Sequence, residues 1–351
     1  MLGSLMRFKF ARDLYSKRVC KRLTEVYDTG KVREMSLDVE TERLVVLSDQ
    51  HKGARNGADD FWRCEPAYCA ALGYYLVAGF KLCILGDAEE LWEVETPGPI
   101  LDHYKEVLAL EKEFQDEPGQ YVRCWGNHDL HWRDEPSALQ QRLPGLELFE
   151  GVKLHLEQGG EELGEAFLVH GHQGTIESEQ LHKVSKQAVG KIYAPIQRWR
   201  KKASTTPARD WRLRDAHSLA MYKWAAGRDR TAPLLLIAGH THEPIFSAPP
   251  SLDQDADQAA VPPAWARAQA EARAAKHPDR STKTLRYEEM KTACYFNTGC
   301  CSYGDGSISG LEICDGKIRL VSWPWPWGKD PPSRVTLDEA SLSEVFKALP
   351  A

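Results

Sequence analysis

Short apolar runs recur along the chain, and each of them stops at a cluster of polar residues. Five such runs contain mainly Val, Ile, Leu and other apolar residues: Arg43–Leu47, Lys81–Leu85, Tyr121–Trp125, Ala166–Val169 and Leu234–Ala238. A short apolar run bounded by polar residues is typical of a buried strand that leads into a functional loop. The pattern therefore predicts five strands, each with polar residues placed directly at its end.

Helical periodicity separates the first three predicted strands. Residues Ala67–Phe80 and Ile100–Phe114 lie between them, and in the second segment apolar residues recur every three to four positions. The strand–helix–strand order predicts right-handed parallel crossovers, which bring ligands to the carboxyl edge of a sheet. Near the C-terminus, Thr292–Asn297 and Gly310–Val321 read as antiparallel strands, the latter with a turn at Asp315-Gly316.

Two segments depart from this alternation. Residues Ile176–Arg230 are helical in pattern, and between Lys183 and Arg214 ten Lys and Arg face one acidic residue, Asp210, a local net charge of +9. This stretch predicts either a basic helical cap or a solvated helical face. The second segment, Pro249–Lys283, is rich in Ala, Pro, Asp and Gln, which predicts a flexible excursion.

These changes in pattern divide the chain into seven predicted segments. They are a basic helical segment at 1–34, the first part of an α/β core at 35–175, a helical basic cap at 176–230, a return to the core at 231–248, the flexible excursion at 249–284, C-terminal core strands at 285–330 and a C-terminal helix at 331–351.

Composition limits the cellular context. The chain has 351 residues, 42% hydrophobic residues and a net charge of −6, which is ordinary for a soluble globular protein. No stretch approaches the ~20 apolar residues of a membrane-spanning helix. Nine cysteines at irregular spacing favour a reducing compartment over a disulfide framework, so we predict a cytoplasmic location. Cys294, Cys300, Cys301 and Cys314 lack a C-x-x-C pair, which favours core or loop thiols over a zinc site.

The polar clusters that follow the five strands contain mainly Asp, Asn and His. In chain order they are Ser48-Asp49-Gln50-His51, Gly86-Asp87-Ala88-Glu89-Glu90, Gly126-Asn127-His128-Asp129, His170-Gly171-His172 and Gly239-His240-Thr241-His242. Carboxylate oxygens and imidazole nitrogens are the ligands that bind first-row transition metals. Five such clusters at strand ends predict a metal site with more than one ion.

The order of these clusters resembles that of the calcineurin-like metallophosphoesterase superfamily, whose signature reads D-x-H, G-D-x-x-[DE], G-N-H-[DE], H and G-H-x-H. The resemblance spans roughly residues 43 to 299. It implies a four-layer α/β/β/α sandwich and two divalent metal ions. The implied ligands are Asp49, His51 and His242 for one ion, Asn127, His170 and His240 for the other, and Asp87 as the bridge. Mixed nitrogen and oxygen ligation favours Mn²⁺, with Fe, Zn or Co as alternatives.

The same resemblance gives His128 a separate role, that of a general acid beside the substrate. Its implied orienting partner is Glu90, and Asp129 is the alternative partner. For Asp129 and His172, a turn or helix-capping role competes with a supporting role in the site. We predict four substrate-binding residues: Arg55, Asn56, His131 and His172.

The second cluster, Gly86-Asp87-x-x-Glu90-x-Trp92, is similar to that of the UDP-2,3-diacylglucosamine hydrolases. Those enzymes cleave a pyrophosphate in lipid A synthesis and also carry a helical insertion between the fourth and fifth motifs. A cationic cap would attract an anionic phosphate by its electrostatic field. Aromatic residues on the insertion favour packing onto the core, with contact to an apolar tail or membrane surface as the alternative: Trp199, Trp211, Tyr222 and Trp224.

We therefore predict a dinuclear-metal hydrolase of phosphate ester or pyrophosphate bonds, acting on a small or lipid-linked anion, in the cytoplasm or at the membrane periphery. A non-catalytic interaction module on the same fold is an alternative from another class, and a broad phosphatase of phosphoproteins or nucleotides is a third. The acidic overall charge and the lack of a nucleic-acid motif disfavour a nucleic-acid partner, although the basic segment would suit one. The sequence does not predict an oligomeric state.

Overall fold

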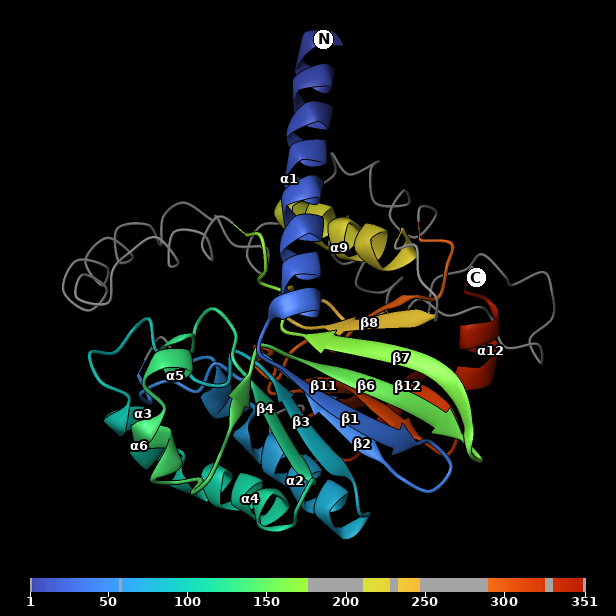
Figure 1. The fold of residues 1–351 in the computed structure, drawn as a ribbon. Helices are drawn as coiled ribbons and strands as arrows, with labels where there is room; N and C mark the ends of the chain where they lie inside the picture. The colour runs from blue at the N-terminus through green and yellow to red at the C-terminus, as the bar shows by residue number, and fades with distance from the viewer. Residues whose placement is uncertain are drawn as a thin grey trace.

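Two β-sheets face one another, and helices cover the outer face of each sheet (Figure 1). The computed structural model describes residues 2–56, 59–175, 211–227, 233–246, 290–325 and 331–349. From one outer face to the other, the layers are α1 with α9, a six-stranded sheet, a seven-stranded sheet, and α2 with α3 and α4. The expected four-layer α/β/β/α sandwich is confirmed.

The seven-stranded sheet has the order β13-β12-β11-β2-β3-β4-β5. Its parallel strands are β2 (Leu44–Leu47), β3 (Lys81–Leu85), β4 (Tyr121–Cys124) and β5 (Leu148–Phe149). Its antiparallel part consists of β11 (Ile308–Cys314), β12 (Lys317–Trp323) and β13 (Val335–Ser341). The helical elements on this side are η1 (Phe61–Arg63), α2 (Glu65–Val77), α3 (Gly98–His103), α4 (Lys105–Asp116), α5 (His131–Asp134) and α6 (Ser137–Gln140).

The six-stranded sheet has the order β1-β6-β7-β8-β10-β9. Its strands are β1 (Val32–Asp38), β6 (Gly151–Gln158), β7 (Glu161–Val169), β8 (Leu234–Ala238), β9 (Ile245–Phe246) and β10 (Tyr295–Asn297). Strand β8 runs parallel to both of its neighbours, β7 and β10. The helices on its outer face are α1 (Leu2–Thr29) and α9 (Trp211–Ala226).

Alternation along the strands explains why the layers stack as they do. In β2, Leu44 and Val46 point into the apolar layer between the sheets, whereas Val45 and Leu47 point to the helices of the outer layer. Successive side chains of a strand point to opposite faces, so a strand that is apolar throughout must be covered on both sides. The unbroken apolar runs seen in the sequence are therefore the mark of central strands in this sandwich.

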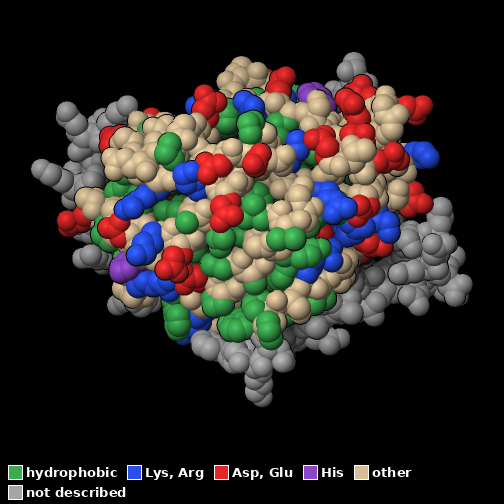
Figure 2. Space-filling view, turned by 90° about the horizontal axis from the view of Figure 1, so that it is seen from below, with side chains coloured by type: hydrophobic (Ala, Val, Ile, Leu, Met, Phe, Trp, Pro, Cys, Tyr) green, Lys and Arg blue, Asp and Glu red, His purple; other side chains and the backbone are tan. Residues whose placement is uncertain are grey.

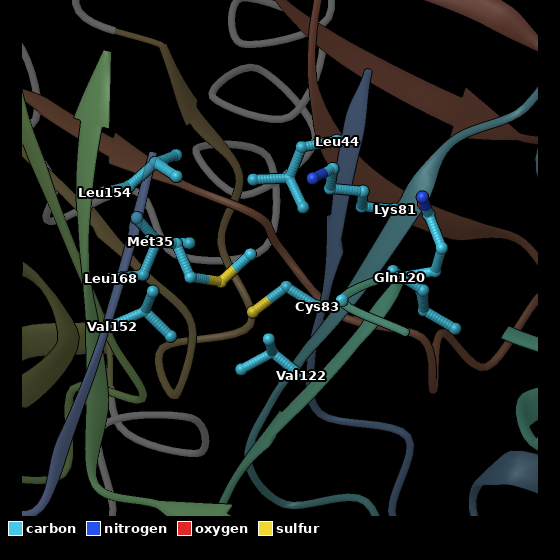
Figure 3. Close-up of a pocket in the computed structure, with 11 residues that line it drawn as sticks. Met35, Leu44, Lys81, Cys83, Gln120, Val122, Val152, Leu154 and Leu168 are labelled. Carbon is cyan, nitrogen blue, oxygen red and sulfur yellow. The ribbon is translucent and has the colours of Figure 1, made fainter. Parts of the chain in front are cut away.

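A small apolar pocket lies in the layer between the sheets, near the amino ends of β3 and β4. Figure 3 shows Met35 and Leu154 of the six-stranded sheet facing Cys83 and Val122 of the seven-stranded sheet there. Lys81, the first residue of β3, lines the same pocket. This pocket is at the edge opposite the polar strand ends, so it is separate from the clusters that suggest chemistry.

The helical face over the seven-stranded sheet carries charges of both signs, interspersed with apolar side chains (Figure 2). Three large hydrophobic residues of η1 and α2 are exposed among the described residues: Trp62, Tyr74 and Val77. Single exposed apolar residues of this kind are normal on a protein surface.

The structure differs from the sequence prediction at the C-terminus. A helix was expected over 331–351, but the chain forms strand β13 first and helix α12 only over Leu342–Lys347. Strand β13 pairs antiparallel with β12, so the edge of the sheet satisfies backbone groups that would otherwise be unpaired. Helix-favouring residues such as Leu337 to Ala340 thus adopt the extended form because the neighbouring strand provides hydrogen-bond partners.

Only the last part of the predicted cap, residues 211–227, is described, and it is helical as expected. Helix α9, the described part of 176–230, packs against α1 and the six-stranded sheet as part of the outer layer. Its Tyr222 and Trp224 are buried, as expected for aromatic residues that pack an insertion onto the core. Residues 176–210, with most of the basic stretch, and the excursion at 249–284 lie outside the described residues. Across the described part of the chain, no helix has the length and apolar character needed to cross a bilayer.

Candidate metal centre

The seven predicted ligands lie on loops that all leave the carboxyl ends of neighbouring strands, and six of the seven form two close groups. Three loops follow β2, β3 and β4 of the seven-stranded sheet, and two follow β7 and β8 of the six-stranded sheet. The loops carry, in that order, Asp49 with His51, Asp87, Asn127, His170, and His240 with His242. The site therefore spans both sheets and not only one.

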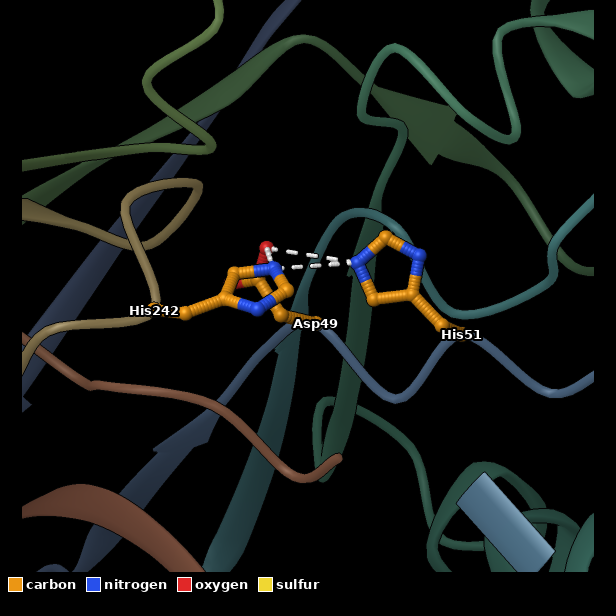
Figure 4. A group of neighbouring side chains, drawn as sticks. All are labelled: Asp49, His51 and His242. Carbon is orange, nitrogen blue, oxygen red and sulfur yellow. Dashed lines mark hydrogen bonds and ion pairs between the residues drawn. The ribbon is translucent and has the colours of Figure 1, made fainter. Parts of the chain in front are cut away.

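Asp49, His51 and His242 form the first cluster, shown in Figure 4. Oδ1 of Asp49 lies 3.2 Å from Nε2 of His242 and 3.9 Å from Nε2 of His51, and the two Nε2 atoms lie 3.1 Å apart. Ligand atoms bound about 2.1 Å from one ion lie roughly 3 to 4 Å from each other. These donor atoms are thus spaced as the ligands of a single cation would be.

Asp87, His170 and His240 form the second cluster, and all three are buried. Nδ1 of His170 donates to the carbonyl oxygen of Leu85 at 2.8 Å, which leaves Nε2 with its lone pair 3.1 Å from Oδ2 of Asp87. Within the described chain, Nε2 of His170, Nε2 of His240 and both amide atoms of Asn127 are buried without a hydrogen-bond partner. Unsatisfied buried polar atoms are costly, and a bound cation would satisfy them.

Asp87 belongs to the second cluster and also lies close to the first. Its Oδ2 is 3.1 Å from Nε2 of His170 in the second cluster and 3.8 Å from Nε2 of His51 in the first. Its Oδ1 accepts the backbone N–H of His128 at 2.8 Å. A Cβ on Gly126 would lie 2.1 Å from Oδ1 of Asp87, so only glycine lets the third loop approach this carboxylate.

The backbone at the site is strained. Positive φ angles between 51° and 65° occur at five of the seven predicted ligands, which are Asp49, His51, Asp87, His240 and His242. This left-handed region disfavours residues with a Cβ and costs on the order of 1 kcal/mol or more for each. Such strain gathers where surrounding structure fixes side chains for function.

Glu90 makes the contact with His128 that the sequence predicted for it. Nδ1 of His128 lies 2.6 Å from Oε2 of Glu90, and the same oxygen lies 3.1 Å from Nδ1 of His51. Burial favours the neutral carboxyl, but the positive His128 outweighs it and lowers the pKa of Glu90 to about 2. Burial likewise lowers the pKa of His128, and Glu90 reverses this and raises it. One carboxylate thus orients both a predicted ligand and the predicted general acid.

Asp129 has a different position from the one proposed for a catalytic partner. Its Oδ1 accepts the backbone N–H of Gly126 at 2.6 Å, and its Oδ2 accepts that of Ala88 at 2.9 Å. Burial, followed by the nearby charge of Asp87, raises the pKa of Asp129 to about 6. The carboxyl therefore caps and joins the second and third loops, whereas Glu90 contacts His128.

The four predicted substrate-binding residues are not equivalent in the structure. His172 is buried, with its ring centroid 5.4 Å from that of His170. Arg55 is exposed, pairs with Glu65 and lies over the ring of Tyr104, with Cζ 4.4 Å from the ring centroid. Asn56 and His131 are also exposed. His172 lies beside the ring of a predicted ligand, and a substrate-binding role stays a prediction for all four residues.

Sequence reasoning missed two aromatic neighbours of the site. Trp92 stacks on His128, with ring centroids 3.8 Å apart and an angle of 21° between the planes. His217 of α9 is fully buried, and its ring centroid lies 5.4 Å from that of His240. The position of Trp92 two residues after Glu90 was a usable signal. No pattern marked His217, because it is more than twenty residues from the nearest polar cluster.

A fully buried group of four charged residues lies beside the site. Nζ of Lys52 is 3.2 Å from Oε1 of Glu89 and 3.0 Å from Oε1 of Glu111. Arg123 pairs with both carboxylates as well, and all four side chains have no exposed surface. We call these residues, Lys52, Glu89, Glu111 and Arg123, the buried charge quartet. Since Lys52 follows His51 and Glu89 precedes Glu90, the quartet joins the first two loops of the site.

Several solved structures resemble the chain over most of its length. A novel archaeal phosphodiesterase shares 12% identity, covers 84% of this chain and 99% of its own, and gives a TM-score of 0.31. The structure of vacuolar protein sorting 29 from Cryptosporidium parvum shares 11% identity with a TM-score of 0.33, and the match covers 86% of this chain and 98% of that one. The structure of a predicted phosphoesterase from Streptococcus pneumoniae shares 11% identity with a TM-score of 0.27, and the match covers 84% of this chain and 97% of that one. No protein-family model and no curated protein match the sequence.

Proposed function

We propose that the chain is a hydrolase of phosphate ester or pyrophosphate bonds that works with two divalent metal ions. The observation that carries this proposal is the position of Oδ2 of Asp87 between two clusters of metal-binding groups. Asp49, His51 and His242 would hold one ion, Asn127, His170 and His240 the other, and Asp87 would bridge them. Mixed oxygen and imidazole donors suit Mn²⁺ best in our proposal, with Fe, Zn or Co as alternatives.

The residues of the chain divide the remaining work among them. When bound, a pair of divalent ions lowers the pKa of water and offsets the charge of phosphoryl oxygens. Glu90 holds His128 through Nδ1, which leaves Nε2 to give a proton to the leaving-group oxygen. Trp92 stacks on the ring of His128 and limits its rotation. Glu90 also accepts a hydrogen bond from Nδ1 of His51, so Nε2 of His51 is left to bind metal.

The proposed substrate is a small or lipid-linked phosphate anion, reached in the cytoplasm or at the membrane periphery. The form of the second cluster, from Gly86 to Trp92, supports a pyrophosphate of the kind cleaved by UDP-2,3-diacylglucosamine hydrolases. The basic stretch between Lys183 and Arg214 supports an anionic substrate in general, through its net charge of +9.

Hydrolysis of bis(p-nitrophenyl) phosphate and of p-nitrophenyl phosphate, with and without Mn²⁺, tests the proposal. The variant His128→Ala should lose about 10²- to 10⁴-fold in turnover of the diester and keep its metal content, since a general acid contributes on that scale. His103→Ala, an exposed histidine of α3, is the matched control and should keep wild-type turnover. A wild-type protein that binds Mn²⁺ but hydrolyses none of these compounds, nor pyrophosphate-linked sugars, would favour a non-catalytic interaction module.

A further inference from the structure

A chain of hydrogen bonds connects helix α1 to the loop that carries His170. The hydroxyl of Tyr15 lies 2.8 Å from Nδ1 of His217, and Nε2 of His217 lies 2.6 Å from the carbonyl oxygen of Gly171. Gly171 directly follows His170, and His217 itself is fully buried. Helices α1 and α9 of the outer layer are thus connected by hydrogen bonds to the loop that carries His170 of the second cluster.

The partners of His217 define its proton position. A carbonyl oxygen only accepts hydrogen bonds, so Nε2 must carry the proton that is shared with Gly171. Nδ1 then has the lone pair and accepts the hydroxyl proton of Tyr15. Since both ring nitrogens are engaged, His217 is not itself a metal ligand, although its ring lies against that of His240 at 5.4 Å and 70°.

A second contact from α1 supports the same loop. Nε of Arg18 donates to the carbonyl oxygen of Gly174 at 2.7 Å. The backbone of Gly174 has a φ of +79°, and a Cβ at this position would lie 2.7 Å from Cα of Val19. Helix α1 therefore packs directly on the backbone of the loop, with no room for a side chain between them.

We propose that His217 is a positioning residue for the metal site built from His170 and His240, and that Tyr15 fixes its tautomer. The inference rests on the proposed metal centre. By holding the carbonyl of Gly171 and the ring of His240, His217 limits the movement of both ligands. Partners that hydrogen-bond the ligands of a metal typically change its affinity by about 10- to 100-fold, and His217 makes its hydrogen bond to the backbone directly beside His170.

Calorimetric titration of the metal-free full-length chain with Mn²⁺ tests the inference. The variant His217→Leu should weaken one of the two binding steps by about 10- to 100-fold and leave the other unchanged. His217→Gln keeps an N–H near the position of Nε2 and should recover most of that loss. Tyr15→Phe removes only the hydroxyl and should weaken the same step at least threefold. Tyr74→Phe, an exposed tyrosine of α2 on the opposite helical layer, should bind Mn²⁺ as the wild type does.

A double-mutant cycle assigns the weakened step to the correct site. In a His170→Ala background, His217→Leu should reduce the affinity of the surviving step less than twofold, whereas in a His242→Ala background it should keep its full effect. Unchanged Mn²⁺ affinities in His217→Leu and Tyr15→Phe, with only a lower Tm, would overturn the inference and leave the metal centre standing. If His217→Leu does not fold, an unchanged affinity in Tyr15→Phe overturns it alone. A wild-type chain that binds none of Mn²⁺, Fe²⁺, Zn²⁺ and Co²⁺ overturns the proposed function and this inference with it.

Discussion

Replacing Glu89 by Gln should destabilise the chain by about 3 to 5 kcal/mol at pH 7, which is the usual cost of removing one partner from a buried ion pair. In the buried charge quartet, two cations face two carboxylates, so the group is neutral as a whole. The substitution leaves Lys52 and Arg123 with a single carboxylate in a place without water. Nε1 of Trp132 also donates to Glu89 at 2.8 Å and would keep an oxygen acceptor in the amide.

The pKa of Glu89 gives an independent magnitude for the same effect. Burial favours the neutral carboxyl, but Arg123 and Lys52 outweigh it and lower the pKa from 4.5 to about 2. At 1.36 kcal/mol per pH unit, this difference corresponds to roughly 3 kcal/mol. Because the pKa is lower in the folded state, the stabilisation is complete above about pH 4.5 and is lost as the pH falls toward 2. This value agrees with the cost of about 3 to 5 kcal/mol for removing one partner from a buried ion pair.

Urea unfolding of the wild type and Glu89→Gln, with EDTA present in both, measures the effect. The difference in free energy of unfolding should be largest at pH 7 and fall to less than half by about pH 3. The matched control is Glu339→Gln, because Glu339 also pairs with a lysine and an arginine, at 2.8 Å from Nζ of Lys317 and 3.1 Å from Nε of Arg319, but on the surface. An exposed network of this kind contributes about 1 kcal/mol or less. Equal losses in the two variants, or a Glu89 effect that does not change with pH, would refute the reasoning.

Three further predictions concern the candidate centre. Gly126→Ala should abolish Mn²⁺ binding at one or both steps in calorimetry while circular dichroism stays native, because its Cβ would displace Oδ1 of Asp87; wild-type affinity would contradict this. Asp129→Asn should lower the free energy of unfolding by about 1 to 3 kcal/mol in urea, because its amide cannot accept the N–H groups of both Gly126 and Ala88; a change below about 0.5 kcal/mol would count against it. Saturating Mn²⁺, at about 100 times Kd, should stabilise the metal-free chain by about 2.7 kcal/mol per site, measured by differential scanning calorimetry, with Ca²⁺ as the weaker control. Equal stabilisation by both ions would argue against the mixed donor set.

The apolar runs predicted the central strands, and the polar clusters at their ends, together with the resemblance to the metallophosphoesterases, predicted that the proposed ligand side chains lie together. An unbroken apolar run such as Leu234–Ala238 must be covered on both faces, and the polar residues after it must lie at the end of a strand. Glu90 as the partner of His128 was implied by the resemblance to the metallophosphoesterases. The second contact of Glu90, with His51, could not be foreseen, because it depends on how far two separate loops approach each other.

Contacts between segments that are far apart in the sequence account for the features that were not predicted. His217 and Tyr15 are 202 residues apart and meet only after α1 and α9 have packed side by side. Strand β13 forms because β12 offers unpaired backbone groups at the edge of the sheet. The residues of β13 alone do not indicate a strand. Glu111 and Arg123 lie on a helix and a strand outside the polar clusters, and their burial is accompanied by ion pairs with Lys52 and Glu89 from distant loops. Each of these features is decided by tertiary contacts and not by residue preference.

The predicted metal ligands lie on loops of both sheets, with Asp49, Asp87 and Asn127 on one and His170 and His240 on the other. The distance between the two halves of the centre is consequently set by the thickness of the apolar layer that separates the sheets. Protein interiors are close-packed, so one added or removed methylene in that layer moves its neighbours instead of being absorbed. Residues such as Val46 and Leu168 of that layer therefore set the spacing of the predicted ligands, and the width of the core fixes the geometry of the candidate centre.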